Sequence, residues 1–179
     1  MAKIYKLYHG TIADFNKVDL RNSLDKKDFG RGFYTTRDLD KARDWAIRRS
    51  RTNRQRNYYI YCLQVDIDII RQYFNVHEFR TSMEWVDYIL VNRLERETRD
   101  KYDLVIGPIA DAETQKEIEI YRSSIRGASV EEIKTAKERL IRKLKQQDLG
   151  IQYCFKTQRI VKYINNTTNC KWTRKEFKW

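Results

Sequence analysis

The distribution of apolar and polar positions along the chain predicts several short strands. Residues 3–8 (KIYKLY) alternate as a half-buried strand does, and residues 58–66 (YYIYCLQVD) combine aromatic with β-branched side chains, which favour strands. Residues 103–106 (DLVI) form a short apolar run that predicts a buried strand. Residues 151–155 (IQYCF) and 159–164 (RIVKYI) are expected to form two final strands, or one strand followed by a turn-rich edge.

Three further segments have the spacing of amphipathic helices. In residues 38–50 the apolar side chains recur every three or four positions, and Asp38 suits the first turn. Residues 81–84 (TSME) have the pattern of a capping box, in which a hydroxyl and a later carboxylate satisfy the first N–H groups of a helix. Residues 129–132 (SVEE) repeat that pattern before a third apolar series. The sequence therefore predicts helices mixed with strands.

The length of the chain, 179 residues, is that of one domain with a short tail. We expect the domain to cover residues 1–165 and a basic, aromatic C-terminal tail to cover residues 166–179. No apolar run approaches the roughly 20 residues that a membrane span needs. The first residues lack the apolar region of a signal peptide, so we expect a cytoplasmic protein without membrane contact.

Neither the cysteines nor the histidines indicate a metal site. Cys62, Cys154 and Cys170 are far apart in the sequence and odd in number, so we expect them to be reduced core residues. The two histidines, His9 and His77, are too few for a site rich in imidazole ligands.

Positive charge is in excess and is unevenly distributed. The 37 Lys and Arg residues outnumber the 25 Asp and Glu residues, which gives a net charge of +12. Cations concentrate in residues 41–56, 134–145 and 156–179. These stretches are either solvated helix faces and a soluble tail, or surfaces that attract a polyanion such as nucleic acid, an acidic protein or a phosphate-bearing cofactor. Charge alone does not choose between the two.

Three short motifs carry the candidate chemistry. Residues 8–11 (YHGT) follow a predicted strand, residues 29–34 (FGRGFY) place two glycines among aromatic residues, and residues 151–153 (IQY) begin a late strand. Each motif alone is typical of a structural role: a packed histidine, a glycine turn and a polar strand start. Their combination is more specific than any one of them.

Together the motifs resemble the ADP-ribosyltransferase fold, in the branch of the poly(ADP-ribose) polymerases and diphtheria toxin. In that branch a strand ends in His-Gly-Ser/Thr, a Gly-x-Gly-x-Tyr motif follows, and a glutamate begins a late strand. The chain also resembles an uncharacterised bacterial family within this fold, which shares its Tyr-His-Gly and Asp-Phe-Gly-Arg-Gly-Phe-Tyr stretches. The resemblance covers residues 4–165 and implies an α+β fold with two antiparallel-rich sheets, flanking helices and a NAD cleft between the sheets.

The resemblance assigns NAD-binding roles to seven residues. It implies that the rings of Tyr34 and Trp45 enclose the nicotinamide, where stacking and cation–π attraction would contribute about 1–2 kcal/mol. It also implies that the main chain of Gly10 pairs with the carboxamide. The resemblance further implies that His9 bonds the adenosine ribose and that Thr11 adds a second polar contact. Gly32 would belong to the glycine turn, and Arg31 would either meet the diphosphate or face solvent.

The catalytic residues implied by the resemblance are His9, Tyr34 and Gln152. Gln152 stands where the family has its glutamate, and its amide forms hydrogen bonds but carries no charge. Chain elongation is therefore not expected, whereas transfer of a single ADP-ribosyl unit is. A carboxylate could instead come from Glu117, Glu119, Asp103 or Asp111. Glu117 and Glu119 also suit the exposed start of a helix, and Asp111 also suits a turn or a helix cap.

The function implied by the resemblance is NAD-dependent mono-ADP-ribosyl transfer by a bacterial toxin or effector, with NAD as the substrate. The acceptor would be a protein, a nucleic acid or a small molecule, and an antitoxin is a further expected partner. Two other functions stay open. One is a non-catalytic module that binds NAD or ADP-ribose, for which the neutral Gln152 argues, and the other is a basic nucleic-acid-binding protein.

Overall fold

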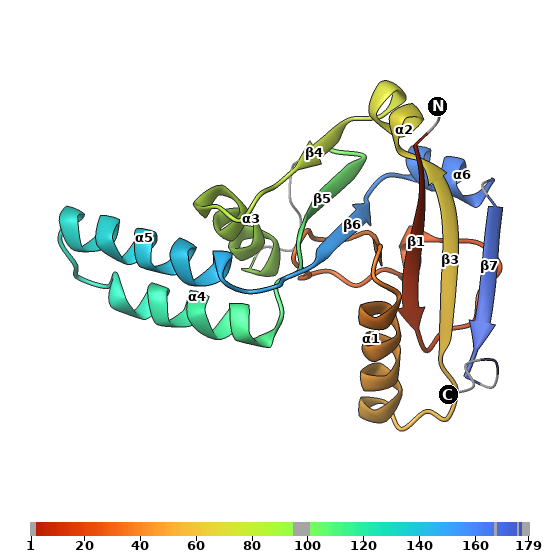
Figure 1. Ribbon diagram of the computed structural model, residues 1–179, viewed down its shortest axis with the longest axis horizontal. Helices are drawn as coiled ribbons and strands as arrows, with labels where there is room; N and C mark the ends of the chain where they lie inside the picture. The colour runs from red at the N-terminus through yellow and green to blue at the C-terminus, as the bar shows by residue number, and fades with distance from the viewer. Residues whose placement is uncertain (1–2, 95–100, 167, 175, 177–179) are drawn as a thin grey trace.

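The computed structural model describes residues 3–94, 101–166, 168–174 and 176. Strands and helices are interleaved along these residues, in an α+β fold (Figure 1). The strands are β1 (Ile4–Thr11), β2 (Phe33–Thr36), β3 (Tyr59–Asp66), β4 (Val76–Glu78), β5 (Leu104–Pro108), β6 (Ile151–Phe155) and β7 (Thr168–Thr173). The helices are η1 (Leu20–Asn22), α1 (Leu39–Thr52), α2 (Ile67–Tyr73), α3 (Met83–Leu94), α4 (Ala112–Ser124), α5 (Val130–Lys145) and α6 (Gln158–Asn165).

The expected helices form, and polar side chains cap their first turns. The carboxylate of Asp38 accepts a main-chain N–H in the first turn of α1. At α5 the expected capping box is present, since Ser129 and Glu132 each accept from the main-chain N–H of the other. In α3 the hydroxyl that accepts a first-turn N–H is that of Ser82, one residue after the expected Thr81.

Residues 159–164 are helical, so the expected strand or turn-rich edge is wrong. They lie in α6, where Thr157 is the N-cap and the buried residues Ile160, Val161 and Ile164 share one face. A short apolar run is compatible with the two-residue period of a strand and with the 3.6-residue period of a helix. Here the N-cap and the residues of the first turn favour the helix. The expected C-terminal tail contributes β7, which pairs with β3; residues 167, 175 and 177–179 of that tail lie outside the described residues.

The strands form one mixed sheet in the order β4-β5-β6-β2-β1-β3-β7. The β4–β5 pair is parallel, and the other neighbouring pairs are antiparallel. The two separate sheets implied by the resemblance are therefore two halves of a single sheet. The halves join between β1 and β2 through one register pair, Tyr8 and Thr36, whereas β1 pairs with β3 along all 8 of its residues. We call this junction the split.

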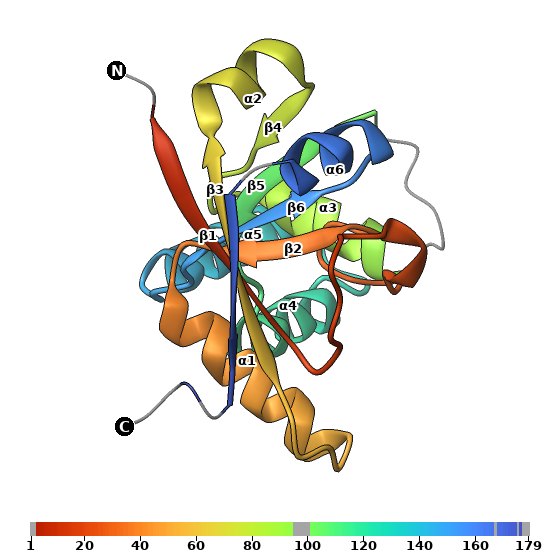
Figure 2. The same ribbon diagram turned by 90° about the vertical axis from the view of Figure 1, so that its right-hand side faces the viewer.

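Because one register pair joins the halves, their strands run in different directions. The β1, β3 and β7 strands stand side by side, and β4, β5 and β6 cross the molecule obliquely (Figure 1). In the perpendicular view, β2 runs at a steep angle to β1 (Figure 2). The physical reason is the small number of paired residues. Several consecutive register pairs would keep the two strands nearly parallel in direction, with only the ordinary twist between neighbours.

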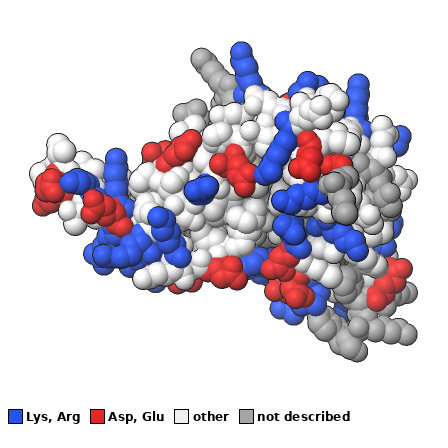
Figure 3. Space-filling model, turned by 45° about the horizontal axis from the view of Figure 1, so that its top comes forward, with Lys and Arg blue, Asp and Glu red and all other residues white. Residues whose placement is uncertain are grey.

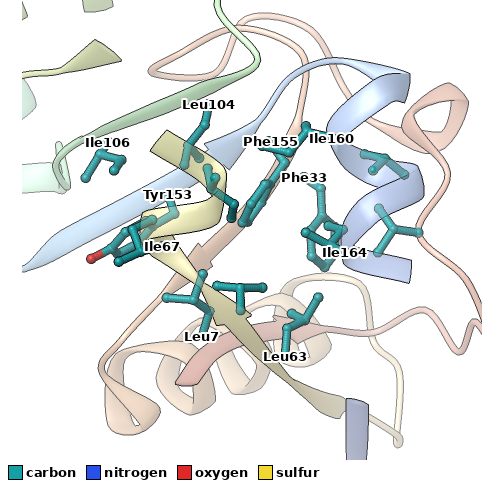
Figure 4. Packing of buried hydrophobic residues seen from close by; sticks show 14 residues of the cluster. Leu7, Phe33, Leu63, Ile67, Leu104, Ile106, Tyr153, Phe155, Ile160 and Ile164 are labelled. Atoms are coloured by element: carbon teal, nitrogen blue, oxygen red, sulfur yellow. The ribbon is translucent and has the colours of Figure 1, made fainter. Parts of the chain in front are cut away.

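Alternation along the strands sends buried side chains to two clusters on opposite faces of the sheet. In β6, Tyr153 and Phe155 join a cluster that α2 and α6 cover, here called the α2–α6 cluster. Cys154 joins a cluster that α3, α4 and α5 cover, here called the α3–α5 cluster. Figure 4 shows the α2–α6 cluster, in which Phe33 and Phe155 of neighbouring strands pack close to α6.

The cysteines are free thiols, but they do not all lie in the core. Cys62 and Cys154 are buried, as expected, whereas Cys170 is exposed on β7. The expectation for Cys170 was wrong because β7 is an edge strand, whose outer residues lack a neighbouring strand. Among the described residues no group of three His, Cys, Asp or Glu side chains is arranged to hold a metal ion.

Two helical features flank the sheet. α1 packs against β1, and α4 and α5 lie side by side as a hairpin that extends away from the sheet, which we call the arm (Figure 1). None of the described helices combines the length and apolar character that crossing a membrane requires.

Candidate functional site

The first two motifs meet at the split through a hydrogen bond. His9 Nδ1 lies 2.6 Å from the main-chain carbonyl oxygen of Tyr34. Burial lowers the pKa of His9 from 6.5 to about 4, so the ring is neutral at pH 7. Because a carbonyl only accepts, Nδ1 carries the proton and donates it, and Nε2 keeps its lone pair. The arrangement therefore offers a fixed hydrogen-bond acceptor at the split.

The rings of His9 and Tyr34 lie on opposite faces of the sheet. His9 packs on Phe33 with ring centroids 4.4 Å apart, and Phe33 belongs to the α2–α6 cluster. Tyr34 is the next residue of β2 and packs against the α3–α5 cluster, at the register position of Cys154. The two expected site residues thus meet through the main chain and not ring to ring.

Gly10 brings α1 into contact with β1. A Cβ built on Gly10 would lie 1.9 Å from the main-chain oxygen of Ala42 in α1, so the close approach requires glycine. This contact also positions Trp45, which is one turn after Ala42 on the same helix. The Trp45 side chain is 51% exposed, and the Arg48 guanidinium carbon lies 5.8 Å from its ring centroid.

Trp45 shares a flank of α1 with Lys41, four residues earlier. Lys41 Nζ donates to the carbonyl oxygen of Asp148 at 3.2 Å, which places this flank beside the segment that leads into β6. Gly10, Tyr34, Trp45 and the start of β6 therefore lie on one side of the sheet, and the His9 ring lies on the other.

The tyrosine of the Gly-x-Gly-x-Tyr motif closes the glycine turn. Tyr34 Oη donates to the carbonyl oxygen of Gly30 at 2.7 Å and accepts from Phe29 N at 3.0 Å. Gly30 has a φ of 76°, which favours glycine. Ser23 Oγ accepts from Gly32 N at 2.9 Å and donates to the Gly32 carbonyl oxygen at 2.7 Å. The motif is therefore a rigid turn that orients the Tyr34 ring.

Lys27 covers one face of the Tyr34 ring, a contact that sequence reasoning missed. Its Nζ lies 5.0 Å from the ring centroid, within cation–π range. Burial lowers the pKa of Lys27, and the like charge of Arg49 contributes to the same shift. Among the described residues, no side chain or carbonyl forms a hydrogen bond or ion pair with the Lys27 ammonium. The ammonium group therefore covers this face of the Tyr34 ring.

Gln152 is buried and its amide is already engaged. Nε2 donates to Asp28 Oδ2 at 2.9 Å and to the Pro108 carbonyl at 3.0 Å. Asp28 Oδ1 accepts from Arg93 at 2.7 Å, and its Oδ2 accepts from Ala110 N at 3.2 Å. This group of residues, the Asp28 network, ties the glycine turn to α3 and β6. Asp28 opens the Asp-Phe-Gly-Arg-Gly stretch, but nothing in the sequence marks Arg93 as its partner.

The other implied NAD contacts have local partners. Thr11 Oγ1 accepts from Ala13 N at 3.1 Å, in the turn after β1. Arg31 is exposed, and its Nε lies 3.3 Å from the Asp25 carboxylate.

The alternative carboxylates have structural roles. Glu117 pairs with Lys143 at 2.8 Å, between the two helices of the arm. Asp111 is the N-cap of α4, which confirms the expectation of a cap. Glu119 accepts from Gln115 in α4, and Asp103 accepts from Arg159 and Thr157 beside α6.

Two grooves open elsewhere on the surface. One, of about 710 Å³, is lined by Lys17, Val18, Asp19, Arg21, Gln158, Lys162, Asn165 and Asn166. The other, of about 590 Å³, is lined by Met83, Lys137, Glu138, Ile141, Arg142, Lys145 and Gln146. Neither contains a residue of the three motifs.

Comparison with known proteins places most of the chain in one family. A family model described as a protein of unknown function (DUF3990) matches residues 5–166. No curated protein and no solved structure matched the chain.

Proposed function

The chain belongs to the DUF3990 family, and on that premise we propose that it is a mono-ADP-ribosyltransferase whose substrate is NAD. The observation that carries the proposal is the 2.6 Å contact between His9 Nδ1 and the Tyr34 carbonyl, because it joins the His-Gly-Thr and Gly-x-Gly-x-Tyr motifs at the split. The two residues are 25 positions apart in the sequence, and their meeting is what a shared binding role requires.

The two faces of the sheet suggest how NAD would lie. On the face that carries Gly10, Tyr34 and Trp45, the nicotinamide would stack on an aromatic ring, with the Gly10 main chain close by. On the opposite face, Nε2 of the neutral His9 would accept a hydrogen bond from a ribose hydroxyl. In this proposal the dinucleotide crosses the split.

The proposed reaction exchanges one bond at the ribose. The bond between the nicotinamide nitrogen and ribose C1′ breaks, and the leaving nicotinamide keeps the electron pair. A nucleophilic atom of the acceptor forms the new bond to C1′ and releases its proton to solvent. Because Gln152 is neutral, it offers no charge to the positive transition state, so we expect slow transfer of single units.

The net charge of +12 favours an anionic macromolecule as the acceptor, either a nucleic acid or an acidic protein. An enzyme that attaches ADP-ribose to such a target inside a bacterium would act as a toxin or effector. The cell that makes it would then need an antitoxin as a protein partner.

A second function, a non-catalytic module that binds NAD or ADP-ribose, is favoured by one observation. The Gln152 amide donates to Asp28 and to the Pro108 carbonyl, and the residue is buried. An amide held in this way is not directed at a bound ribose. The module would use the same Tyr34 and Trp45 face without breaking the glycosidic bond.

The test measures NAD binding by calorimetry and nicotinamide release by chromatography, on the full chain. Trp45→Ala should weaken NAD binding about tenfold, since it removes an exposed stacking ring without touching the core. Tyr73→Ala is the matched control, because Tyr73 is also an exposed aromatic, 63% accessible, and lies in α2. It should leave NAD binding unchanged.

Three outcomes are decisive. Binding together with nicotinamide release, both reduced by Trp45→Ala, supports the transferase. Binding without release, with or without nucleic acid and protein acceptors, supports the binding module instead. Absence of NAD binding by the folded wild type overturns both proposals.

A further inference from the structure

The arm presents a helix face that the proposed NAD chemistry does not use. α4 and α5 pack on each other through buried residues, among them Ile118 and Leu140. The pair Lys143 and Glu117, at 2.8 Å, also joins them. The opposite side of α5 faces solvent where the arm extends from the body (Figure 1).

This outer side of α5 is strongly basic. Four exposed cations lie on this side and on the flank toward α3, at spacings of three to five residues: Lys134, Lys137, Arg142 and Lys145. We call them the α5 basic face. Figure 3 shows Lys and Arg side chains gathered on the arm. Among the described residues, none of these four has a carboxylate within ion-pair distance, although Glu138 is four residues from both Lys134 and Arg142.

Helix stability explains only part of this charge. Cations in the last turn, such as Arg142 and Lys145, interact favourably with the helix dipole. Lys134 and Lys137 lie in the first half of the helix, where the dipole gives them no such benefit. Like charges three residues apart also repel each other, by a few tenths of a kcal/mol per pair. The helix dipole therefore does not account for the first two cations.

The basic face borders a concave surface. The groove of about 590 Å³ is lined by three of the four cations, together with Met83 at the first turn of α3 and Ile141. One carboxylate, that of Glu138, lies in the same lining. The groove therefore has an excess of positive charge, while Met83, Ile141 and the alkyl stems of the cations make most of its exposed lining apolar.

We propose that the α5 basic face binds the phosphate backbone of a duplex nucleic acid. From Lys134 to Lys145 the helix rises about 16 Å, a length along which one strand of a duplex carries about five phosphates. Backbone binding needs only positioned cations, since its free energy comes mainly from counterion release. It is independent of NAD and holds whether or not the chain cleaves NAD.

Two features of the face favour a duplex over other polyanions. The centres of protein–protein interfaces are depleted of charged residues, whereas three of the groove's lining residues are cations and only one is a carboxylate. A single-stranded nucleic acid is usually held by aromatic rings that stack on its bases, and the groove lining contains no aromatic residue. A duplex offers its phosphates without requiring an uncharged centre or aromatic rings.

The experiment measures fluorescence anisotropy of a labelled duplex of about 20 base pairs, without NAD, over a series of salt concentrations. The test variant is Lys137→Ala/Arg142→Ala/Lys145→Ala. The matched control is Lys116→Ala/Arg122→Ala/Arg126→Ala, which removes three exposed cations from α4 and the turn that follows it. Circular dichroism melting checks that both variants are folded.

The wild type should bind the duplex with log K falling linearly against log salt concentration. The α5 variant should bind about tenfold more weakly or worse, and its slope should be shallower by about 2–3, because each lost phosphate contact removes about 0.9. The control should keep most of the affinity and the wild-type slope. The same duplex results are expected whether or not NAD binds, so failure here is distinguishable from failure of the proposed NAD chemistry.

Three results would overturn the proposal. One is absence of duplex binding by the wild type at low salt. Another is an equal loss in the α5 and α4 variants, since that is the effect of net charge alone. The third is tighter binding of a single strand that depends on Trp45, which would move the nucleic-acid surface to α1.

Discussion

The Gln152 side-chain amide donates to the Asp28 carboxylate at 2.9 Å, across 124 positions of the sequence. Asp28 receives Arg93 on its other oxygen, so its charge is balanced by the guanidinium and its lone pairs are used. Gln152, for which the resemblance implied a catalytic position, therefore holds the glycine turn against β6. The absence of a carboxylate at position 152 has a structural reason.

Gln152→Glu should destabilise the fold, because it replaces a donor to Asp28 with a second carboxylate. We expect a loss of about 2–4 kcal/mol in the free energy of unfolding at pH 7, measured by urea denaturation. Adding Asp28→Asn to the same chain should recover part of this loss, since the amide introduced at position 28 can donate to the carboxylate introduced at position 152. Equal stability of Gln152→Glu and wild type would contradict the Asp28 network.

The half-buried His9 should make stability depend on pH. Its pKa in the folded chain, about 4, is below the value of 6.5 for the unfolded chain. Between these values the unfolded chain binds the extra proton, so stability falls as the pH is lowered, by up to about 3 kcal/mol. Denaturation curves between about pH 7 and pH 5 measure the slope. His9→Gln should flatten it.

Gly10→Ala should separate α1 from β1. The added methyl would lie 1.9 Å from the Ala42 main-chain oxygen, which a flexible side chain cannot relieve. We expect a loss of about 3 kcal/mol or more, together with weaker NAD binding, because Trp45 moves with the helix. Gly127→Ala is the control: its φ is 73° but nothing lies within 4 Å of the new methyl, so thermal unfolding should show a loss of only about 1 kcal/mol.

Lys27→Met should improve the use of NAD if the nicotinamide stacks on Tyr34. In the proposed site, the ammonium 5.0 Å from the ring centroid would compete with the cationic nicotinamide for the same aromatic face. Removing the competitor should lower KM for NAD about three- to tenfold. Lys26→Met makes the same charge change at an exposed neighbour and should leave KM unchanged. A higher KM for Lys27→Met would mean that Lys27 binds the diphosphate.

Local chemistry made much of the fold predictable from the sequence. The strand at residues 58–66 and the helix at 38–50 have strong periodicity and caps, and both form within two residues of the expected bounds. Residues 159–164 were misassigned because six residues do not distinguish a strand from a buried helix. The single sheet was not predictable, because pairing between distant strands leaves no local signal.

The candidate site was predictable only as far as local motifs reach. The meeting of His9 with the Tyr34 segment was expected from the family resemblance and not from any one motif. The contacts of Lys27 and Arg93 could not be predicted in this way. Lys27 contacts the face of the Tyr34 ring, and Arg93 bonds Asp28, which is 65 positions away in the sequence. The engagement of Gln152 likewise depends on tertiary contacts.

His9 also extends the link between the two halves of the sheet beyond the main-chain ladder. Strands that pair through the main chain are about 4.8 Å apart, whatever their side chains. β1 and β2 have one such register pair, Tyr8 and Thr36, and next to it the Tyr34 carbonyl is met by the His9 imidazole. A substitution at position 9 can therefore change this contact between the halves without altering the hydrogen-bonding pattern of either strand.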